Sequence, residues 1–395
     1  MTDAEKRVAI VGASGYVGTT LVERALHRGE RNVVAIIHSS GNAWRLARWG
    51  VALTAADLLN RNDLAKALEG CTHVVNCTRG GNDVMFDGLA NLLGVCRDLD
   101  VRGFVHLSSV LVHGDPPPPN SVSEDGDTHP ATGSYGWIKL QQDAMVQKAA
   151  AAGLPASILC PPNITGAYSG YLLAIVDAIR NERFALVDGG EAPVNVVDVH
   201  NLCHAIELAI DRGSREARRM FITDDEPVRW IDLVAPLAKL AEVELPLPGI
   251  AAEALRRMRD ADTAMPRGSL GRSVKHLVSS DVREALRKDP LLARADAWMR
   301  RTVGKLGTRV EDALRSSIEG PRRVAMASDG KPLHVALCAQ QLRGVRHSCE
   351  EAKRRLGYRP QYSFAKSMAA FEAWYRAHTG MDTDAWPLLR LLMQP

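Results

Sequence analysis

The sequence lacks any arrangement of cysteines that would support a disulfide framework or a zinc knuckle. It contains seven cysteines, an odd number, and no two of them have C-x-x-C spacing. Disulfide-dependent secreted folds carry an even number of cysteines, and structural zinc sites carry closely spaced pairs. We therefore expect the cysteines to be small buried residues in a reducing compartment.

Long apolar stretches are also missing. No run approaches the ~18 apolar residues that a membrane-spanning helix needs. The polar start, residues 1–7, lacks the charged beginning and apolar middle of a signal peptide. We therefore expect a cytoplasmic protein without an integral membrane segment.

The sequence also disfavours a nucleic-acid-binding protein and a metalloprotein. Aromatic residues make up only 5% of the chain, and no nucleic-acid-binding module is recognisable, so we expect no nucleic-acid partner. No His/Asp/Glu cluster has metal-ligand spacing, so we expect no metal. What remains, 46% hydrophobic and 24% charged residues with a formal net charge of +3, is typical of a soluble globular protein.

Strands and helices alternate through the first part of the chain. With 395 residues the chain is longer than one core supports, because cores stop growing near about 250–300 residues. The pattern predicts an α/β fold, a doubly wound parallel sheet (Rossmann-like) with a smaller C-terminal substrate lobe that contains a helical insertion. The expected strands are 7–11, 33–37, 73–76, 103–107 and 156–159, and the expected helices include 64–68, 89–99 and 134–152.

The predicted domains divide near residue 165. Residues 1–165 form the dinucleotide-binding domain, to which a strand and helix near 194–211 return, and residues 166–395 form the substrate lobe. Functional residues in such folds collect at the carboxyl ends of the strands.

A glycine-rich loop follows the first strand. Gly12, Gly15 and Gly18 have G-x-x-G-x-x-G spacing between a strand and a helix. Gly12 permits the tight turn, Gly15 lets the backbone approach a diphosphate, and Gly18 lets the helix pack close to the sheet. Because the helix N-terminus adds free N–H groups and a positive dipole end, we expect a dinucleotide site here.

The end of the second strand bears on the choice of cofactor. NAD sites often place an acid there for the ribose 2′-hydroxyl, whereas this strand runs into His38 and Ser39. Arg45 and Arg48 follow, and an arginine can meet a 2′-phosphate bidentately. We therefore favour NADP, with NAD not excluded, and place Asp57-Leu58 beside the adenine. The remaining residues expected to bind the cofactor are Ser14, Tyr16, Val17, Cys77, Thr78, Tyr135, Lys139 and Pro161.

Ser109, Tyr135 and Lys139 form a catalytic constellation. Ser109 ends the 103–107 strand, 26 residues before Tyr135, and Lys139 lies four residues after Tyr135 on the same helix face. A tyrosine with an ordinary pKa near ~10 is a poor acid–base group at neutral pH, and a lysine cation one turn away favours its phenolate. A serine hydroxyl orients the reacting oxygen, so the three residues suit hydride exchange with a nicotinamide.

At this point the chain resembles an extended short-chain dehydrogenase/reductase of the NAD-dependent epimerase/dehydratase family. The matching segments are 12–18, 57–58, 104–114, 135–139, 159–166 and 356–360. The resemblance covers about 1–245 and 345–376. It implies that Ser109 orients the substrate oxygen, Tyr135 is the acid–base and Lys139 activates it. It also implies that Pro161 lies near the nicotinamide amide, that Asn163 and Val110 face the substrate, and that the protein is a homodimer.

Departures from the family pattern narrow the expected reaction. Family dehydratases and decarboxylases carry acids just after the catalytic serine or threonine, where this chain has Val110 and Leu111. Many nucleotide-sugar enzymes carry an arginine where this chain has Val194. Our first expectation is an oxidoreductase or epimerase for a sugar-derived alcohol or ketone. The alternatives are a 3β-hydroxysteroid-dehydrogenase-like enzyme for a bulky apolar substrate and a non-catalytic NAD(P)-sensing regulator.

Residues 250–345 are the least family-like and the most basic part of the chain. They contain 19 Lys+Arg and 11 Asp+Glu, a net charge of +8 against −5 for the rest. Apolar periodicities at 254–258 and 291–299 predict amphipathic helices. Three interpretations stay open: a helical cap over the substrate cleft, an interface helix in an oligomer, and a surface for an anionic substrate or for peripheral membrane contact.

Overall fold

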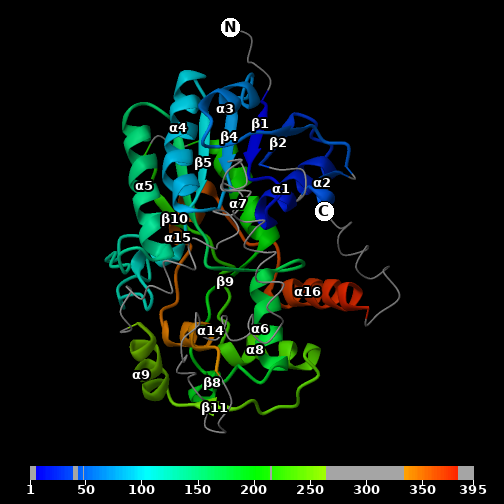
Figure 1. Cartoon of the computed structure of the whole chain (residues 1–395), viewed down its shortest axis with the longest axis vertical. Helices are drawn as coiled ribbons and strands as arrows, with labels where there is room; N and C mark the ends of the chain where they lie inside the picture. The colour runs from blue at the N-terminus through cyan, green and yellow to red at the C-terminus, as the bar shows by residue number, and fades with distance from the viewer. Residues whose placement is uncertain (1–5, 39–42, 48, 214–215, 264–332, 381–395) are drawn as a thin grey trace, which may run out of the picture.

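A seven-stranded parallel sheet organises the upper half of the molecule (Figure 1). The structure is a computed structural model that describes residues 6–38, 43–47, 49–213, 216–263 and 333–380. The strand order is β10-β6-β5-β4-β1-β2-β3. The bounds are β1 (Val8–Val11), β2 (Val33–Ile37), β3 (Leu53–Ala55), β4 (His73–Asn76), β5 (Gly103–Leu107), β6 (Ala156–Cys160) and β10 (Arg219–Phe221).

Helices cover both faces of the sheet, as the alternating side chains of its strands require. Val8 and Ile10 of β1 join the core beneath α1 (Tyr16–His27) and α7 (Val199–Arg212). Ala9 and Val11 face the opposite way, into the core beneath the second helical layer. That layer comprises α3 (Arg61–Ala67), α4 (Leu89–Asp98) and α5 (Tyr135–Ala151). The doubly wound sheet is therefore confirmed.

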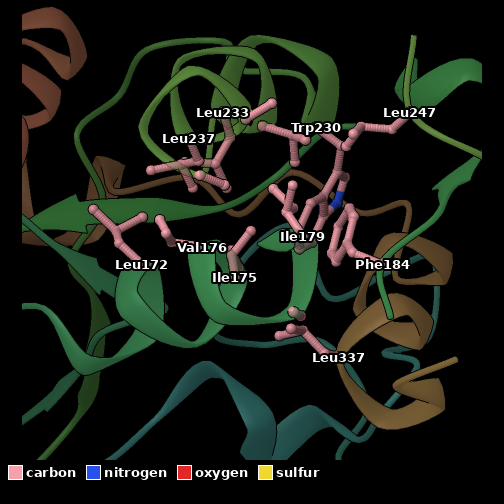
Figure 2. Close-up of a cluster of buried hydrophobic side chains, with 14 of the residues drawn as sticks. Leu172, Ile175, Val176, Ile179, Phe184, Trp230, Leu233, Leu237, Leu247 and Leu337 are labelled. Carbon is pink, nitrogen blue, oxygen red and sulfur yellow. The ribbon is translucent and has the colours of Figure 1, made fainter. Parts of the chain in front are cut away.

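The lower half of the molecule has its own apolar core, drawn in Figure 2. Trp230 and Phe184 pack there with ring centroids 6.5 Å apart, among side chains from α6 (Gly170–Arg180) and α8 (Trp230–Leu240). The other elements are β8 (Leu186–Val187), η4 (Asp188–Gly190), β11 (Gly249–Ile250), α9 (Ala252–Thr263), α14 (Val335–Cys338), η5 (Ala339–Leu342) and α16 (Phe364–Thr379). This lobe closes the space beyond the carboxyl ends of the strands.

The strand expected to return near residue 194 does not enter the main sheet. It is β9 (Val196–Asp198), which pairs in parallel with β7 (Asn163–Thr165) in a separate two-stranded sheet. The strand that extends the main sheet is β10, which pairs with β6. The helix returns as expected: α7 packs beside α1, and α15 (Glu350–Leu356) adds Ala352 and Leu356 to the same core.

The basic segment is described only at its two ends. The expected helix at 254–258 is part of α9, in which Leu255 is fully buried. The expected helix at 291–299 lies outside the described residues. Among the described residues, no helix combines the length and apolar character needed to cross a membrane. All seven cysteines are free, six of them buried and Cys77 half-buried.

Candidate active site

The glycine loop connects β1 to α1 and leaves the start of the helix open. Gly12 has a φ of +81°, and a Cβ added there would lie 3.1 Å from the backbone of Cys77 and Thr78. A Cβ on Gly18 would lie 2.4 Å from the carbonyl oxygen of Gly12. No side chain caps α1 at Gly15. The tight turn and the uncapped helix N-terminus fit the diphosphate of a dinucleotide.

Tyr16 ties this loop to the second sheet. Its hydroxyl donates to the carbonyl oxygen of Thr165 across 2.7 Å, so the loop is held against the end of β7. Ser14 is half-buried at the turn, and Val17 is buried in the core beneath α1. Val17 can therefore meet a cofactor through its backbone rather than its side chain.

The loop after β4 forms the second wall of the expected cofactor site. Thr78 donates through both its backbone N–H and its hydroxyl to Oδ1 of Asn76, at 3.1 and 2.6 Å. Burial raises the pKa of the Cys77 thiol to about 12, so this cysteine stays neutral beside Gly12. The structure thus brings Cys77 and Thr78 to the glycine loop, and their binding of a cofactor stays a prediction.

Arg45 is held against α1 by its own contacts, and its expected role with a 2′-phosphate stays a prediction. Its guanidinium donates to Glu23 of α1 across 2.6 Å and lies 3.9 Å over the ring of Tyr168. Arg45 is only 8% exposed, because this pairing draws it into α2 (Trp44–Ala47) against the side of α1. His38 is exposed at the end of β2, whereas Ser39 and Arg48 lie outside the described residues.

Asp57 and Leu58 follow β3 and face different ways. Asp57 is exposed and accepts a hydrogen bond from the backbone N–H of Leu59 across 2.9 Å. Leu58 is buried in the core, where its Cβ lies next to Gly88. Asp57 is thus the member of the pair with a solvent-facing side chain at this edge of the sheet.

Ser109 lies at the carboxyl end of β5 with its hydroxyl already oriented. Ser109 is the N-cap of η3 (Val110–His113), and its Oγ accepts the N–H of Leu111 across 3.2 Å. Its O–H proton therefore remains available to donate to a substrate oxygen. The neighbouring Val110 donates its N–H to the carbonyl oxygen of Pro161 across 3.3 Å, which places Pro161 close to the residue after Ser109.

Gly136 lets the start of α5, which carries Tyr135, pack closely against η3, which follows Ser109. Tyr135 begins α5, and Ser134 caps the helix by accepting the N–H of Trp137. A Cβ at Gly136 would lie only 2.1 Å from the carbonyl oxygen of Leu111. Only a glycine lets the start of α5 press this closely on η3, so Gly136 is a site residue that the sequence analysis missed.

Tyr135 is half-buried next to a cation that the sequence analysis also missed. Burial raises the pKa of its hydroxyl, and the nearby Arg79 opposes that shift. The Arg79 guanidinium lies 5.1 Å from the centre of the tyrosine ring, and the Lys139 ammonium lies 5.8 Å from it. Two cations therefore flank this phenol, one from the loop after β4 and one from α5 itself.

Lys139, one helical turn after Tyr135, is held in place by a series of buried hydrogen bonds. Its ammonium donates to the carbonyl oxygen of Leu107 at 2.8 Å and to Oε1 of Gln142 at 2.9 Å. Gln142 in turn donates to the carbonyl oxygen of Met85, in the short π-helical turn η2 (Val84–Gly88), at 2.6 Å. Burial lowers the pKa of Lys139 to about 8, which makes it a cation that titrates near the operating pH.

An ion pair lies beneath this series of hydrogen bonds. Asp143, fully buried one residue after Gln142, accepts a hydrogen bond from Arg219 of β10 across 2.6 Å. Burial raises the pKa of Asp143, and Arg219 opposes the shift. The pair joins α5 to the last strand of the sheet and so fixes the face of α5 that carries Tyr135 and Lys139.

A small cleft of about 20 Å³ opens next to Val110, the residue after Ser109. Val110 and Asn163, both expected to face the substrate, line it. Asn163 donates to Oε1 of Gln340 across 3.4 Å. The other lining residues are Leu111, Gly114, Pro117, Pro162, Pro193, Val194, Asn195, Trp230, Arg343 and His347. Gln340 and Arg343 belong to the basic segment, so its described end reaches the cleft.

Both basic side chains among these lining residues are already engaged. Arg343 donates to both carboxylate oxygens of Asp115, at 3.0 and 2.8 Å. Nδ1 of His347 lies 2.7 Å from the carbonyl oxygen of Ser121, and burial lowers the pKa of this histidine to about 4. His113 is fully buried and packs edge-on against Phe221, so it is a core residue rather than a cleft residue.

The glycine loop and the Ser109–Tyr135–Lys139 group therefore both lie at the carboxyl ends of strands in one parallel sheet. A family model described as the NAD dependent epimerase/dehydratase family matches residues 8–222, which span both features. Among the described residues, no group of three or more His, Cys, Asp and Glu is placed to hold a metal ion.

Three curated relatives each match more than half of this chain. A 4-hydroxy-2-methyl-3-oxo-4-farnesyl-3,4-dihydroquinoline-1-oxide ketoreductase from Stigmatella aurantiaca is 28% identical over 63% of this chain and 78% of its own length. The sterol-4-alpha-carboxylate 3-dehydrogenase, decarboxylating, of Mus musculus is 27% identical over 56% of this chain and 65% of its own length. A UDP-glucose 4-epimerase from Vibrio cholerae is 21% identical over 62% of this chain and 79% of its own length.

Solved structures share the fold across nearly the whole chain. A nucleoside-diphosphate-sugar epimerase from Pseudomonas aeruginosa has a TM-score of 0.61 at 18% identity, covering 95% of this chain and 99% of its own. A dTDP-glucose 4,6-dehydratase from Bacillus anthracis, in complex with NAD, has a TM-score of 0.63 at 12% identity, covering 95% and 98%. At these identities the likeness establishes the architecture.

Proposed function

The chain belongs to the NAD dependent epimerase/dehydratase family, and we propose that it interconverts a bulky, uncharged secondary alcohol and the corresponding ketone. The observation that carries this proposal is that Val110, the residue after Ser109, and Asn163, two residues after Pro161, line a cleft in which Arg343 is already paired. The family match supports an enzyme of this kind, because the chain's relatives include a ketoreductase and an epimerase.

The nicotinamide dinucleotide supplies or accepts the hydride. Gly12, Gly15 and Gly18 would hold its diphosphate against the open N-terminus of α1. Because Arg45 is committed to Glu23 and Tyr168, it is not free to meet a 2′-phosphate. We therefore propose NAD as the preferred cofactor, in place of our first expectation of NADP.

Ser109 and Tyr135 act on the substrate oxygen. The Ser109 hydroxyl, whose oxygen already accepts the N–H of Leu111, donates to that oxygen and orients it. Tyr135 gives its phenolic proton to the oxygen during ketone reduction and takes a proton from it during alcohol oxidation. The proton must move as the hydride moves, because a free alkoxide is far too basic to form at neutral pH.

Lys139 and Arg79 stabilise the ionised, phenolate form of Tyr135. Burial alone raises the pKa of Tyr135, which suits a proton donor but not a base. A cation within a few ångströms favours the charged phenolate, and the guanidinium of Arg79 and the ammonium of Lys139 lie on either side of the ring. Proton exchange in both directions therefore depends on both cations.

The lining of the cleft favours an apolar substrate over a nucleotide sugar. A diphosphate needs unpaired cations or open backbone N–H groups, whereas Arg343 is bonded to Asp115 and His347 is neutral. Val110, Leu111, Val194 and Trp230 supply an apolar wall. The curated relative named for a farnesylated quinoline oxide supports the same substrate class, and the relative named for a sterol carboxylate supports a bulky ring system.

A substrate panel tests this proposal. The purified chain is mixed with NAD and a 3β-hydroxysteroid, or with NADH and the matching 3-ketosteroid, and reduced nicotinamide is followed by absorbance. UDP-glucose with NAD serves as the nucleotide-sugar arm, with UDP-galactose as the product sought. We expect kcat/KM for the steroid to exceed that for UDP-glucose by at least ~10-fold, the factor that about 1.4 kcal/mol of binding supplies.

A matched variant separates the two substrate classes. Asp115→Asn removes the charge that occupies Arg343 and should increase UDP-glucose binding while leaving steroid turnover nearly unchanged. Epimerisation of UDP-glucose by the unmodified chain, without turnover of any apolar alcohol or ketone, would contradict the proposed substrate class. Bound cofactor with no hydride exchange on any member of the panel would instead support a sensing regulator.

A further inference from the structure

The loop after β4 touches both halves of the active site through three consecutive residues. A Cβ on Gly12 would lie 3.1 Å from the backbone of Cys77 and of Thr78, so this loop borders the glycine loop. The next residue, Arg79, is exposed, and its guanidinium lies 5.1 Å from the centre of the Tyr135 ring. The conformation of the loop therefore bears on the cofactor site and on the acid–base at once.

Asn76, at the end of β4, sets the turn into this loop. Its side chain is buried, and its Oδ1 accepts both the backbone N–H and the hydroxyl of Thr78, at 3.1 and 2.6 Å. A backbone N–H can only donate, so the atom of Asn76 that faces it is the amide oxygen and not the amide nitrogen. The amide nitrogen therefore points the other way, toward β5.

His106 of β5 accepts a hydrogen bond from that amide nitrogen. Asn76 and His106 are register partners on neighbouring strands, and Nδ2 of Asn76 lies 3.2 Å from Nδ1 of His106. Because Nδ2 carries only donors, Nδ1 is the acceptor and the imidazole proton sits on Nε2. Burial, together with the charge of Lys139, lowers the pKa of His106 well below its usual range, so the ring is neutral.

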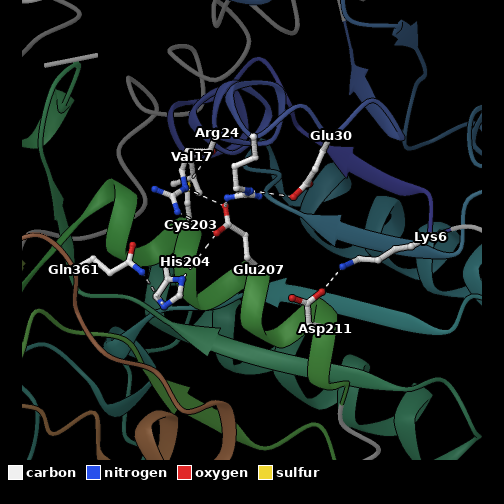
Figure 3. A network of polar contacts seen from close by, with 10 residues as sticks. Lys6, Val17, Arg24, Glu30, Cys203, His204, Glu207, Asp211 and Gln361 are labelled. Carbon is white, nitrogen blue, oxygen red and sulfur yellow. Dashed lines mark hydrogen bonds and ion pairs between the residues drawn. The ribbon is translucent and has the colours of Figure 1, made fainter. Parts of the chain in front are cut away.

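The Nε2–H group of His106 has no hydrogen-bond partner among the described residues. His204 on α7 differs, because its Nδ1 lies 4.0 Å from Glu207 and its Nε2 lies 3.5 Å from Gln361 (Figure 3). A buried donor without an acceptor lowers the stability of a fold, and an apolar side chain at position 106 would carry no such group. Within the described chain, the partner that the imidazole of His106 does have is Asn76.

We propose that Asn76, held by His106, is a positioning residue for the loop after β4. It fixes that loop for dinucleotide binding and keeps Arg79 over the ring of Tyr135. The proposal rests on the proposed function in taking Tyr135 as the acid–base and the glycine loop as the dinucleotide site. Two hydrogen bonds from Thr78 to one buried oxygen hold the turn, and Arg79 follows Thr78 directly. Without Asn76 the exposed guanidinium moves from the phenol into water.

This role is tested with two readouts that need no substrate. The Kd for NADH is measured by nicotinamide fluorescence. The pKa of Tyr135 is followed by NMR on protein with tyrosine labelled at Cζ, and Tyr135→Phe assigns the signal. Asn76→Leu keeps a side chain of similar size and removes the acceptor. We expect it to raise the Kd for NADH at least ~10-fold. We also expect the pKa of Tyr135 to rise by about 1, because a cation within ~6 Å of the phenol is lost.

A double-mutant cycle shows whether Asn76 acts through Arg79. Arg79→Met should raise the pKa of Tyr135 by the same amount as Asn76→Leu, because each variant removes the guanidinium from the phenol. The double variant should therefore raise that pKa no further than either single variant. Additive changes would show that Asn76 affects Tyr135 by another route, and would overturn the proposal.

Variants of His106 separate its acceptor atom from its bulk. An asparagine side chain places its oxygen where histidine places Nδ1, whereas glutamine reaches the position of Nε2. His106→Asn should therefore leave the Kd for NADH nearly unchanged. His106→Gln and His106→Leu should raise it at least ~3-fold, the effect of one weak hydrogen bond. Equal losses in all three variants would mean that only the bulk of the ring matters, and would contradict the role given to Nδ1.

Asn201 on α7 provides a matched control outside this loop. It is fully buried, and its Oδ1 accepts the backbone N–H groups of Gln361 and Tyr362, at 2.7 and 2.9 Å. Asn201→Leu should lower the free energy of unfolding, as Asn76→Leu does, but should change neither the Kd for NADH nor the pKa of Tyr135. Equal changes in the two variants would reveal a general loosening of the fold and would overturn the proposal.

Failure of this proposal is distinguishable from failure of the proposed function. An unmodified chain that binds NADH but turns over none of the substrates leaves both readouts intact. An unmodified chain that binds no NADH would refute the proposed function, and the Tyr135 titration would still decide whether Asn76 acts through Arg79. Asn76→Leu with an unchanged Kd for NADH and an unchanged pKa of Tyr135 would overturn the positioning role outright.

Discussion

The ammonium group of Lys139 donates to Oε1 of Gln142 across 2.9 Å, and Gln142 donates in turn to the carbonyl oxygen of Met85 across 2.6 Å. The amide oxygen binds the ammonium form more strongly than the neutral amine, because a hydrogen bond from a charged donor is stronger, so Gln142 stabilises the charged form of the lysine. Gln142 is therefore a positioning residue that acts through Lys139.

We predict that Gln142→Leu shifts the pH dependence of the reaction. Burial already lowers the pKa of Lys139 to about 8, and loss of an acceptor lowers it further. A hydrogen bond to a charged group contributes about 1.5 kcal/mol or more, or roughly one pH unit. The alkaline limb of the kcat/KM profile should therefore move about one unit toward lower pH.

Two variants check the cause of that shift. Gln142→Glu places a negative charge beside Lys139 and should move the alkaline limb to higher pH. Gln141→Leu, at the adjacent half-buried position on α5, should leave the profile in place. An identical displacement in all three variants would mean that the effect is a general loosening of α5.

We predict that Gly18→Ala weakens dinucleotide binding. A Cβ at this position would lie 2.4 Å from the carbonyl oxygen of Gly12 and 2.8 Å from Cα of Ala13, so either α1 or the loop must move. Titration with NADH, followed by nicotinamide fluorescence, should show a Kd raised at least ~10-fold, the equivalent of about 1.4 kcal/mol. Gly170→Ala, where a Cβ meets no atom within 4 Å, should bind NADH normally.

We predict that Arg219→Met destabilises the protein strongly. The substitution leaves the fully buried carboxylate of Asp143 without its ion-pair partner. Breaking a buried pair on one side costs about 3–5 kcal/mol, which denaturant unfolding can measure. Arg257→Met, in an exposed pair with Glu253, should cost about 0.5 kcal/mol or less. Equal losses in the two variants would contradict a special role for the buried pair.

We predict that Asp224→Asn changes the pH dependence of stability. Burial raises the pKa of Asp224 to about 7, although the N–H groups of Asn201 and Asp198 oppose the shift. Between about pH 4 and 7 the folded chain therefore binds a proton that the unfolded chain releases, so the contribution of Asp224 falls as the pH rises. Unfolding free energies at pH 5 and 7.5 should differ less in the variant than in the original chain.

Much of the sheet was predictable from short apolar runs. The strands expected at 73–76 and 103–107 are β4 and β5 as the structure has them, and Ser134 caps α5 as predicted. These features depend on neighbouring residues, so local patterns determine them. β9 and β10 are only three residues long, and the choice of partner for so short a strand is made by packing.

The site residues that the sequence did not reveal depend on contacts between distant segments. Arg45 follows β2 as a phosphate-binding arginine would, yet its partner Glu23 lies 22 residues earlier, on α1. Arg79 comes to lie beside Tyr135 only after α5 and the loop behind β4 are packed together. Gln142 had a local signal, since it follows Lys139 by three residues on α5 and so shares a helix face with it. Gly136 had a local signal, since a glycine in the first turn of a helix is unfavourable without a close contact.

Tyr135→Phe tests the central claim most directly, namely that the phenol at the start of α5 moves the substrate proton. The variant removes one oxygen atom from a half-buried ring and leaves the glycine loop untouched. Turnover of the alcohol–ketone pair is measured beside NADH binding. The account predicts a loss of at least ~100-fold in kcat, typical for removing a general acid–base, with the Kd for NADH nearly unchanged. Turnover equal to that of the original chain would contradict it.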